Sequence, residues 1–369
     1  MLKIKPFISA RLRRCRSMLA EKQLAGLIVL DPADVSYLTG FQGDDSVLVL
    51  TAGKRLLITD TRFTVQAHEE CPGLPLLLRK EPMTEAIAEA YGKLQPGRRG
   101  WTRPIGIEKG SITLGQYQTL RKKTGRTLEP VEGIVTELRQ AKDGYEIAQI
   151  TKAIRIAEDA FVALRDHIRL GMSEAQLKAR LEYEMSVRGS TVPSFPSIVA
   201  FAGHAAQPHA IAGNARLRGG QPLLCDWGAT LNGYRSDLTR CLAAGRISPV
   251  FAEAYQLVLE AQLSAIQAVK PGAALAEVDA AARKTIRRPW PVYGHGTGHG
   301  LGLNVHEAPR LGPKIKGALR EGMVVTVEPG MYLPGRFGIR IEDDVLVTAR
   351  GGKVLSRLDK SLESVRLEI

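Results

Sequence analysis

Residues 223–239 constrain the fold most, because they predict a β-hairpin whose register follows from its turn. At their centre lies the pair Asn232-Gly233, with a strand-like segment on each side. Asn-Gly is the strongest short hairpin signal, since a type I′ turn needs positive φ at both central residues. If these two residues form the turn, residue 231 faces 234 and the pairing continues outward in step.

This register brings two aspartates together. Asp226 then lies opposite Thr239 and Asp237 opposite Gly228, so the two carboxylates share one face as diagonal neighbours. Such neighbours lie about 7–8 Å apart at Cα and closer between side chains. Two anions among apolar residues repel and are poorly solvated, and divalent cations would relieve that cost. Taken alone, two strand carboxylates that face solvent explain the pattern equally well.

A glycine-rich segment holds three of the seven histidines. His295, His299 and His306 fall within residues 293–307, together with five glycines. Glycine at that density lets the backbone approach a ligand closely, and imidazole is the commonest neutral nitrogen ligand. The combination predicts a site here rather than isolated core or surface histidines.

Two further carboxylates, Glu328 and Glu342, follow in strand-like segments. Residues 324–328 predict a strand that ends in a turn at Pro329-Gly330, and residues 338–347 predict a second strand. Arg340 shares a face with Glu342 by the period of two, so the arginine could orient a ligand carboxylate. An ordinary edge strand with an exposed acidic tip is the alternative.

Together the three segments offer four carboxylates and one imidazole. Four negative charges balance two divalent cations, and this donor set suits Mn²⁺ first, with Co²⁺, Fe²⁺ and Zn²⁺ as alternatives. The four cysteines show no CxxC pattern and no framework spacing. Buried free thiols are therefore expected, with no thiolate ligand.

The pattern along the chain predicts two domains. Residues 1–135 alternate strand-like and helical runs, which indicates an α/β domain with strands at 26–30, 46–51, 55–59 and 104–108 and helices at 62–70 and 83–94. Residues 136–145 are expected to be a linker, and residues 146–369 a second domain. Apolar steps of three and four from Ile147 predict a long helix that Gly171 can terminate. Ser173 and Gln176 offer a capping box for the next helix, and further helices are expected at 248–270 and 274–288.

Composition narrows the class of partner. A net charge of +13 would suit nucleic acid, yet the basic residues are spread along the chain and not interleaved with aromatic residues. We therefore expect no nucleic-acid partner. No run approaches 18 apolar residues, so no membrane span is expected. The Arg-rich first 22 residues have no apolar region and no cleavage site, which favours a folded first helix and the cytoplasm.

The chain resembles the pita-bread metallopeptidases, in the branch of Xaa-Pro dipeptidase (prolidase) and aminopeptidase P. The motifs that carry the resemblance are CDWGATLNGYRSDLTR, HGTGHGLGLNVHEAP, VVTVEPGMY and GIRIEDD, in this order. Residues 1–135, with Val35–Phe41 among them, are similar to the family's creatinase-type N-terminal domain. The implied fold is an α/β creatinase-like domain followed by an α+β pita-bread catalytic domain.

The resemblance also implies roles for residues. Asp226 would bind one metal ion, His299 and Glu328 the second, and Asp237 and Glu342 would bridge both. A metal-bridged hydroxide would attack the carbonyl that precedes proline, with Glu328 as proton shuttle and His306 steadying the tetrahedral intermediate. The positions implied to contact or support the substrate are His209, His295, His306, Tyr332 and Arg340. A homodimer and proline-containing dipeptides or short peptides as substrates are implied as well.

Some positions depart from the family's common pattern. Trp227 stands where the family more often has Phe, Asn304 stands where it often has an acid, and residues 287–291 are short and Pro-rich. These departures bear on substrate preference and leave every ligand position intact. Dipeptidase and aminopeptidase action both remain open. A metal-free hydrolase like creatinase would lack the ligands, and a non-catalytic binding protein would be favoured by lost ligands or a basic tail.

Overall fold

The computed structural model describes residues 4–94, 103–125, 128–286 and 289–369. The chain divides into two compact units, Met1–Arg139 and Gln140–Ile369. Within the described residues, none of the helices combines the length and the apolar character that crossing a membrane requires.

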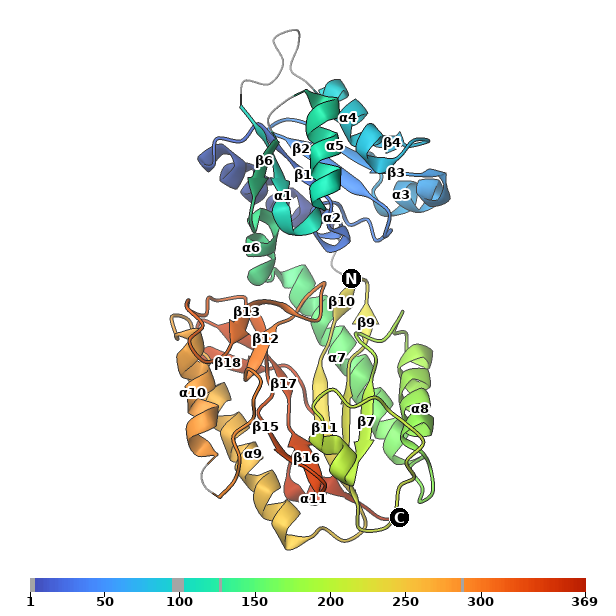
Figure 1. Cartoon of the computed structure of the whole chain (residues 1–369), viewed down its shortest axis with the longest axis vertical. Helices are drawn as coiled ribbons and strands as arrows, with labels where there is room; N and C mark the ends of the chain where they lie inside the picture. The colour runs from blue at the N-terminus through green and yellow to red at the C-terminus, as the bar shows by residue number, and fades with distance from the viewer. Residues whose placement is uncertain (1–3, 95–102, 126–127, 287–288) are drawn as a thin grey trace. The chain divides into compact units, whose positions relative to one another are not determined.

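The first unit is built on one six-stranded sheet in the order β4-β3-β2-β1-β5-β6 (Figure 1). Strand β1 pairs antiparallel with β2 and parallel with β5, which makes the sheet mixed. Its core packs Ile28, Val49, Ile58 and Ile107 against Ile87 of α4. The elements are α1 (Lys5–Glu21), β1 (Gly26–Val29), α2 (Pro32–Thr39), β2 (Val47–Thr51), β3 (Arg55–Thr59), α3 (Thr64–Glu70), β4 (Leu76–Leu78), α4 (Met83–Leu94), β5 (Ile105–Glu108), α5 (Leu114–Thr124), β6 (Leu128–Val131) and α6 (Ile134–Gln140). The four predicted strands and two predicted helices are thus confirmed.

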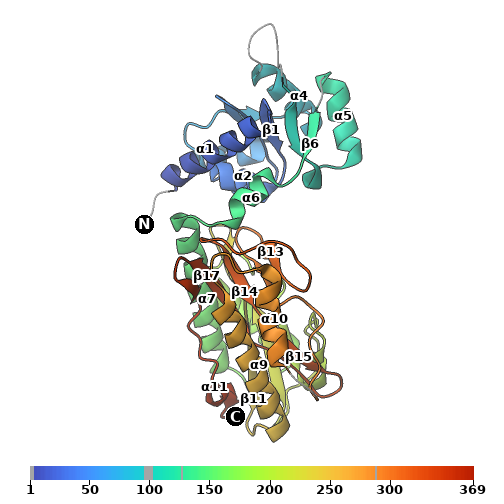
Figure 2. The same ribbon diagram turned by 90° about the vertical axis from the view of Figure 1, so that its left-hand side faces the viewer.

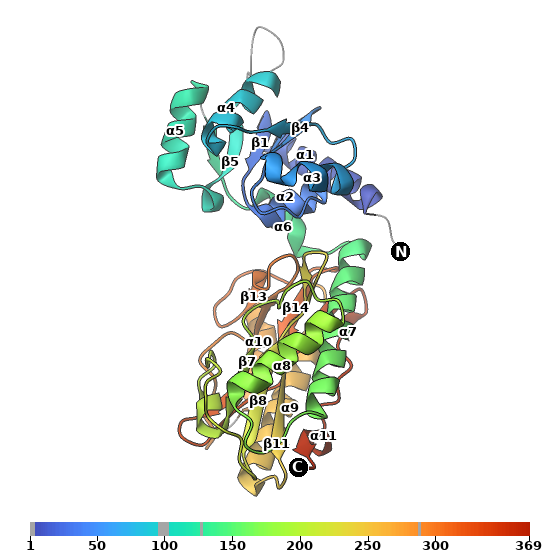
Figure 3. The same cartoon turned by 90° about the vertical axis from the view of Figure 1, so that its right-hand side faces the viewer.

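The second unit places strands between two pairs of helices. Its helices are α7 (Gly144–Arg165), α8 (Glu174–Val187), α9 (Pro249–Ala268), α10 (Leu275–Thr285) and α11 (Leu362–Val365). Figure 2 shows α9 and α10 side by side on one flank, and Figure 3 shows α7 and α8 on the other. The capping box of Ser173 and Gln176 is confirmed.

Two helix ends differ from the prediction or lie beyond what is described. Helix α7 ends at Arg165, before Gly171, because the chain tightens into a turn in which the amide of His167 donates to the carbonyl of Leu164. Gly171 lies further on, with a φ of 84°. Helix α10 ends at Thr285, and residues 287–288 of the predicted helix lie outside the described residues.

In the described residues of this unit, the strands form two larger sheets and two small hairpins. The larger sheets have the orders β19-β11-β8-β7 and β13-β12-β14-β17-β18, and the hairpins are β9–β10 and β15–β16. The strands are β7 (Ile198–Phe201), β8 (Pro222–Trp227), β9 (Thr230–Leu231), β10 (Tyr234–Arg235), β11 (Leu238–Ala244), β12 (Gly298–Gly300), β13 (Glu307–Leu311), β14 (Val324–Val327), β15 (Gly330–Leu333), β16 (Phe337–Arg340), β17 (Asp343–Thr348), β18 (Gly351–Val354) and β19 (Arg366–Leu367).

The hairpin at residues 223–239 has the predicted register. Asn232 and Gly233 have φ values of 50° and 80°, as a type I′ turn requires. Tyr234 pairs with Leu231, and Thr239 pairs with Asp226. The turn therefore sets the face on which Asp226 lies, several residues away.

The single strand predicted for 338–347 is wrong, because the chain leaves one sheet for another between β16 and β17. Glu342 lies at this crossing and forms an isolated bridge with Thr239. The buried guanidinium of Arg240 donates to the carbonyl oxygen of Glu342 at 2.6 Å. This side-chain bond replaces a backbone bond of the sheet, so the carbonyl of Glu342 stays hydrogen-bonded where the strand is interrupted.

Candidate metal centre

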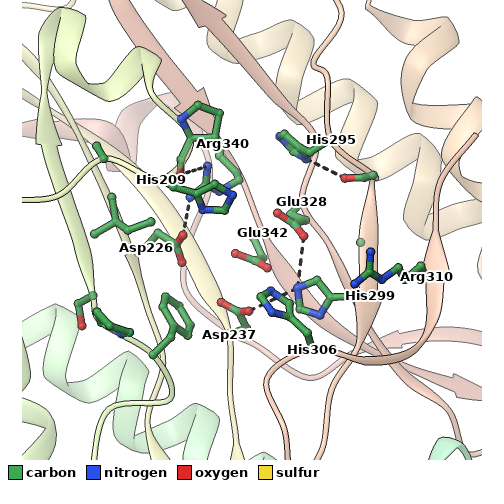
Figure 4. Close-up of a pocket in the computed structure, with 18 of the residues that line it drawn as sticks. His209, Asp226, Asp237, His295, His299, His306, Arg310, Glu328, Arg340 and Glu342 are labelled. Carbon is green, nitrogen blue, oxygen red and sulfur yellow. Dashed lines mark hydrogen bonds and ion pairs between the residues drawn. The ribbon is translucent and has the colours of Figure 1, made fainter. Parts of the chain in front are cut away.

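A cavity of about 840 Å³ opens in the second unit and gathers nearly all the residues singled out in the sequence. Asp226 lies in β8, His299 in β12, and Asp237, Glu328 and Glu342 lie next to the ends of β11, β14 and β17. Figure 4 shows these side chains directed toward one another. His209, His295, His306 and Arg340 line the same cavity. Tyr332 contacts it through His295, whose Nε2 lies 2.9 Å from the Tyr332 hydroxyl.

Within the described residues, Asp237, His299 and Glu342 form one group able to hold a metal ion. One ligand atom from each lies within 4.8 Å of the others, and all three residues are buried. Glu328 joins them through His299, whose Nε2 lies 3.4 Å from Glu328 Oε1 and 3.7 Å from Asp237 Oδ2. Asp226 is held apart by an ion pair with Arg340.

The carboxylates are close enough to disturb one another's ionisation. Burial and the charge of Glu342 raise the pKa of Asp237 well above its usual range. Burial and the charge of Glu328 do the same for Glu342, and burial raises the pKa of Glu328 to about 7. Burial also raises the pKa of Asp226, against the opposing effect of Arg340. The cavity therefore lacks enough positive charge for four ionised carboxylates.

These residues fit divalent metal ions. Asp226 Oδ1 is buried and has no hydrogen-bond partner within the described part of the chain. Acceptor oxygens in excess of donors are what a hard or borderline cation satisfies. The nearest thiols, Cys225 and Cys241, are buried and outside the cavity lining, and burial raises the pKa of both. The side chains that meet in the cavity offer oxygen and nitrogen donors.

His295, His299 and His306 favour the neutral form. Burial lowers the pKa of His295 and of His299 to about 4. Burial and the charge of Arg310 lower the pKa of His306, whose ring packs edge-on against His299 with centroids 4.4 Å apart. A neutral imidazole has a free lone pair, which a metal ligand needs.

Arg340 is buried and contacts groups of the protein itself. Its guanidinium pairs with Asp226 and donates to the Tyr332 hydroxyl at 2.8 Å and to the Thr239 hydroxyl at 3.1 Å. Thr239 in turn donates to Glu342 at 2.6 Å. Arg340 and Thr239 thus orient two of the carboxylates from behind.

Two features of the site were missed in the sequence. Arg310 lines the cavity from β13 and has no ion pair within the described residues. Asp279 of α10 accepts bonds from the amide and the hydroxyl of Thr297, and Arg283 donates to the carbonyls of Tyr293 and His295. The spacing of Asp279 and Arg283 by four residues was a helical ion-pair signal, but nothing in it pointed to the glycine-rich segment.

Trp227 does not line the cavity, so this departure from the family pattern places no different side chain against a bound substrate. Its fully buried ring stacks on Phe161 with centroids 4.4 Å apart, and its indole N–H donates to the carbonyl of Ala157 in α7 at 2.9 Å. Asn304 is exposed and likewise does not line the cavity. These two departures affect packing and surface rather than the cavity wall.

We expect Trp227→Phe to lower the free energy of unfolding by about 1–2 kcal/mol, because one buried hydrogen bond and part of a stacked ring are lost. Urea unfolding measures this change. Catalytic constants at a temperature where both proteins are folded should stay within about twofold. A change in preference among substrates would contradict the placement of Trp227 behind the cavity wall.

Strands, helices and cavity together define a two-unit protein with a carboxylate–imidazole centre, and comparison with known proteins gives the family. The family described as Metallopeptidase family M24 matches residues 148–349, and the Creatinase/Prolidase N-terminal domain matches residues 11–141. The chain belongs to metallopeptidase family M24 and is a metallopeptidase with a creatinase-type N-terminal domain. The predicted fold class is confirmed.

Named relatives share almost the whole length. An Xaa-Pro dipeptidase of Pyrococcus furiosus is 32% identical over 359 residues, which cover 95% of this chain and 99% of the relative. The solved structure of an Xaa-Pro dipeptidase from Bacillus anthracis has a TM-score of 0.90 at 33% identity and covers 98% of this chain and 100% of that one. An X-Pro aminopeptidase from Thermotoga maritima has a TM-score of 0.86 at 33% identity and covers 94% and 99%.

Proposed function

We propose that this cavity hydrolyses the bond between the first residue and proline in Xaa-Pro dipeptides, with two divalent metal ions. The observation that carries the proposal is the convergence of Asp226, Asp237, Glu328 and Glu342 with His299 in one buried centre. Relatives named Xaa-Pro dipeptidase and X-Pro aminopeptidase, each about a third identical over nearly full length, support the substrate class.

Each ligand group has its own place in the proposal. Asp226 would hold one ion, His299 and Glu328 would hold the other, and Asp237 and Glu342 would contribute to both. Divalent ions held there supply Lewis acidity toward the scissile carbonyl and a water activated near neutral pH. Mn²⁺ suits the oxygen-rich set best, and Co²⁺, Fe²⁺ and Zn²⁺ are alternatives.

Other groups of the cavity act on protons and on the substrate. Glu328 follows the end of β14 and lies beside His299, and in this proposal it passes a proton from the attacking water to the leaving nitrogen. His306 and His209 are exposed and line the cavity. In this proposal His306 donates a hydrogen bond to the reacting carbonyl, and His209 contacts the substrate. His295, bonded to Tyr332, forms a fixed polar wall for the substrate.

Arg310 favours a dipeptide over a longer peptide. A free proline carboxylate is the end of an Xaa-Pro dipeptide, whereas a longer peptide carries a neutral amide at that place. The Arg310 guanidinium lies on the wall of the cavity and has no ion pair among the residues that the structure describes, so it is suited to a carboxylate through paired charge-assisted bonds. Of the other cavity cations, Lys178 pairs with Glu182 and Arg340 with Asp226.

The test is hydrolysis of Ala-Pro and Ala-Pro-Ala by metal-stripped protein, with and without added Mn²⁺ or Co²⁺. Metal-restored cleavage supports the peptidase, and faster cleavage of Ala-Pro supports the dipeptidase assignment. A folded protein that binds two ions and cleaves neither peptide would contradict the proposal.

Metal binding should release protons. Because the pKa values of Asp237 and Glu342 lie well above their usual range and that of Glu328 is about 7, the metal-free centre holds protons near pH 7. Ligation requires the ionised forms, so we expect at least about one proton released per chain and tighter binding as pH rises. Calorimetric titration in buffers of different ionisation enthalpy measures this number. A binding enthalpy that is independent of the buffer below pH 7 would show that no proton is released and would contradict this prediction.

Two expectations about the whole protein stay predictions. The homodimer expected from the family resemblance is tested by the mass in solution scattering, and a monomeric mass would contradict it. The cytoplasmic location is tested by fractionation of the cells that produce the protein.

A further inference from the structure

Glu174 is a buried carboxylate outside the proposed chemistry. It is the first residue of α8 and follows the capping residue Ser173, and it is 0% exposed. Its oxygens accept from the amide of Phe201 at 2.9 Å, from the amide of Gly213 at 2.9 Å and from Nδ1 of His204 at 2.8 Å. One buried side chain thus bonds both ends of the segment 201–213.

This segment forms one wall of the cavity. Its members that line the cavity are Pro208, His209, Ala210, Ile211 and Ala212. Figure 4 shows His209 beside Arg340 and Asp226, on the side of the cavity that holds the carboxylates. Arg340 donates to the carbonyl of Pro208 at 3.4 Å, so the residue before His209 is held from the metal side as well.

The segment has an enforced conformation. Ala202, directly after Phe201, has a φ of 44°, which a residue with a side chain adopts when its surroundings require it. A Cβ on Gly203 would lie 2.9 Å from the carbonyl carbon of Gly335, and one on Gly338 would lie 1.7 Å from the carbonyl oxygen of Ala205. The short helix at Ala202–Ala206 is therefore pressed against the β15–β16 hairpin, and its residue His204 is bonded to Glu174.

Backbone hydrogen bonds also hold the end of the segment and the chain that follows it against the start of α8, and they do not depend on the side chain of Glu174. The amide of Glu174 donates to the carbonyl of Ala215 at 3.1 Å, and the amide of Ala175 donates to that of Gly213 at 2.9 Å. These backbone bonds remain in a Glu174→Gln protein. In the wild-type protein each carboxylate oxygen of Glu174 accepts from a backbone N–H. In Glu174→Gln one of these oxygens becomes an NH₂ donor, which would face a backbone N–H and lose that hydrogen bond.

We infer that Glu174 is a positioning residue for the substrate side of the site, which acts by fixing segment 201–213 so that His209 stands over the metal centre. The inference rests on the proposed function for its kinetic meaning. It assigns Glu174 no contact with metal or substrate. The geometry of the segment itself can be tested without any activity.

The kinetic test is a double-mutant cycle on full-length, metal-loaded protein. Glu174→Gln should lower kcat/KM for Ala-Pro by about tenfold, the scale of one lost charge-assisted bond, with the metal content unchanged. In a His209→Ala background the same change should cost less than about twofold, because the group it positions is gone. The matched control is Glu184→Gln, a buried glutamate on the same helix whose ion pairs are to Arg180 of that helix and to its C-cap residue Arg188. It should leave kcat/KM unchanged.

The inference is overturned if the tenfold loss persists in the His209→Ala background, or if metal content falls with activity. Should Glu174→Gln fail to fold, His204→Ala removes one donor at a half-buried position and enters the same cycle, with a smaller loss expected.

Hydrogen exchange separates failure of this inference from failure of the proposed function. In Glu174→Gln the amides of Phe201 and Gly213 should exchange faster, and in Glu184→Gln they should not. Unchanged exchange overturns the positioning role, whatever the activity. Faster exchange in a protein that cleaves no Xaa-Pro peptide upholds the geometry and rejects the peptidase.

Discussion

Replacing Asp237 by Asn should abolish most of the metal-restored cleavage of Ala-Pro, with kcat lowered by roughly a thousandfold or more. Asp237 is 4% exposed and shares the metal-capable group with His299 and Glu342. Losing a charged ligand in a buried site costs on the order of 4 kcal/mol, which corresponds to about this factor in rate. Steady-state kinetics with saturating Mn²⁺, together with metal analysis of the purified protein, measure the effect.

The same substitution should not weaken the metal-free protein. Burial and the charge of Glu342 raise the pKa of Asp237 well above its usual range, so the neutral amide removes repulsion rather than a stabilising bond. The melting temperature without metal should hold or rise, while its increase on adding Mn²⁺ should shrink. Asp159→Asn, at an exposed position of α7, is the matched control and should change neither quantity. If the melting temperature of the metal-free Asp237→Asn protein falls strongly, Asp237 is a structural residue.

The local geometry around the two aspartates followed from the sequence because a turn type and a period of two determine it. Asn232-Gly233 leaves few turns available, and each pair outward from it is then fixed in register. The prediction therefore held as far as the pairing of Asp226 with Thr239. The helix patterns of the second unit held for the same kind of reason, since steps of three and four define one face.

The arrangement around Glu342 could not be predicted from periodicity. The apolar and polar residues from Gly338 to Val347 alternate as in one strand, yet the chain crosses between sheets at Glu342. There the Arg240 guanidinium donates a hydrogen bond to the carbonyl oxygen of Glu342. Arg240 lies far away in sequence, and local patterns contain no information about such a partner. Glu174 is a similar case, because its partners lie in a loop that begins at Phe201.

The role of Arg310 was also not predicted from the sequence, and its substitution should have the second large effect on catalysis. Arg310→Gln should lower kcat/KM for Ala-Pro by about 10- to 100-fold, mainly through KM, because a charge-assisted bond to the free carboxylate of proline is lost. Cleavage of Ala-Pro-amide, which has no such carboxylate, should change by less than about twofold. The comparison belongs near pH 8, because Arg310 lowers the pKa of His306 and its removal lets that pKa rise.

Lys178→Gln is the control that distinguishes a specific ion pair from the general positive potential of the cavity. Lys178 also lines the cavity, but its ammonium lies 3.1 Å from Glu182, so its charge is already compensated. It should change the ratio of Ala-Pro to Ala-Pro-amide cleavage by less than about twofold. If Arg310→Gln slows both substrates equally, Arg310 acts on His306 or on the metal ligands, and the preference for a dipeptide must come from the shape of the cavity. If it slows only Ala-Pro, one guanidinium in β13 makes this metallopeptidase a dipeptidase.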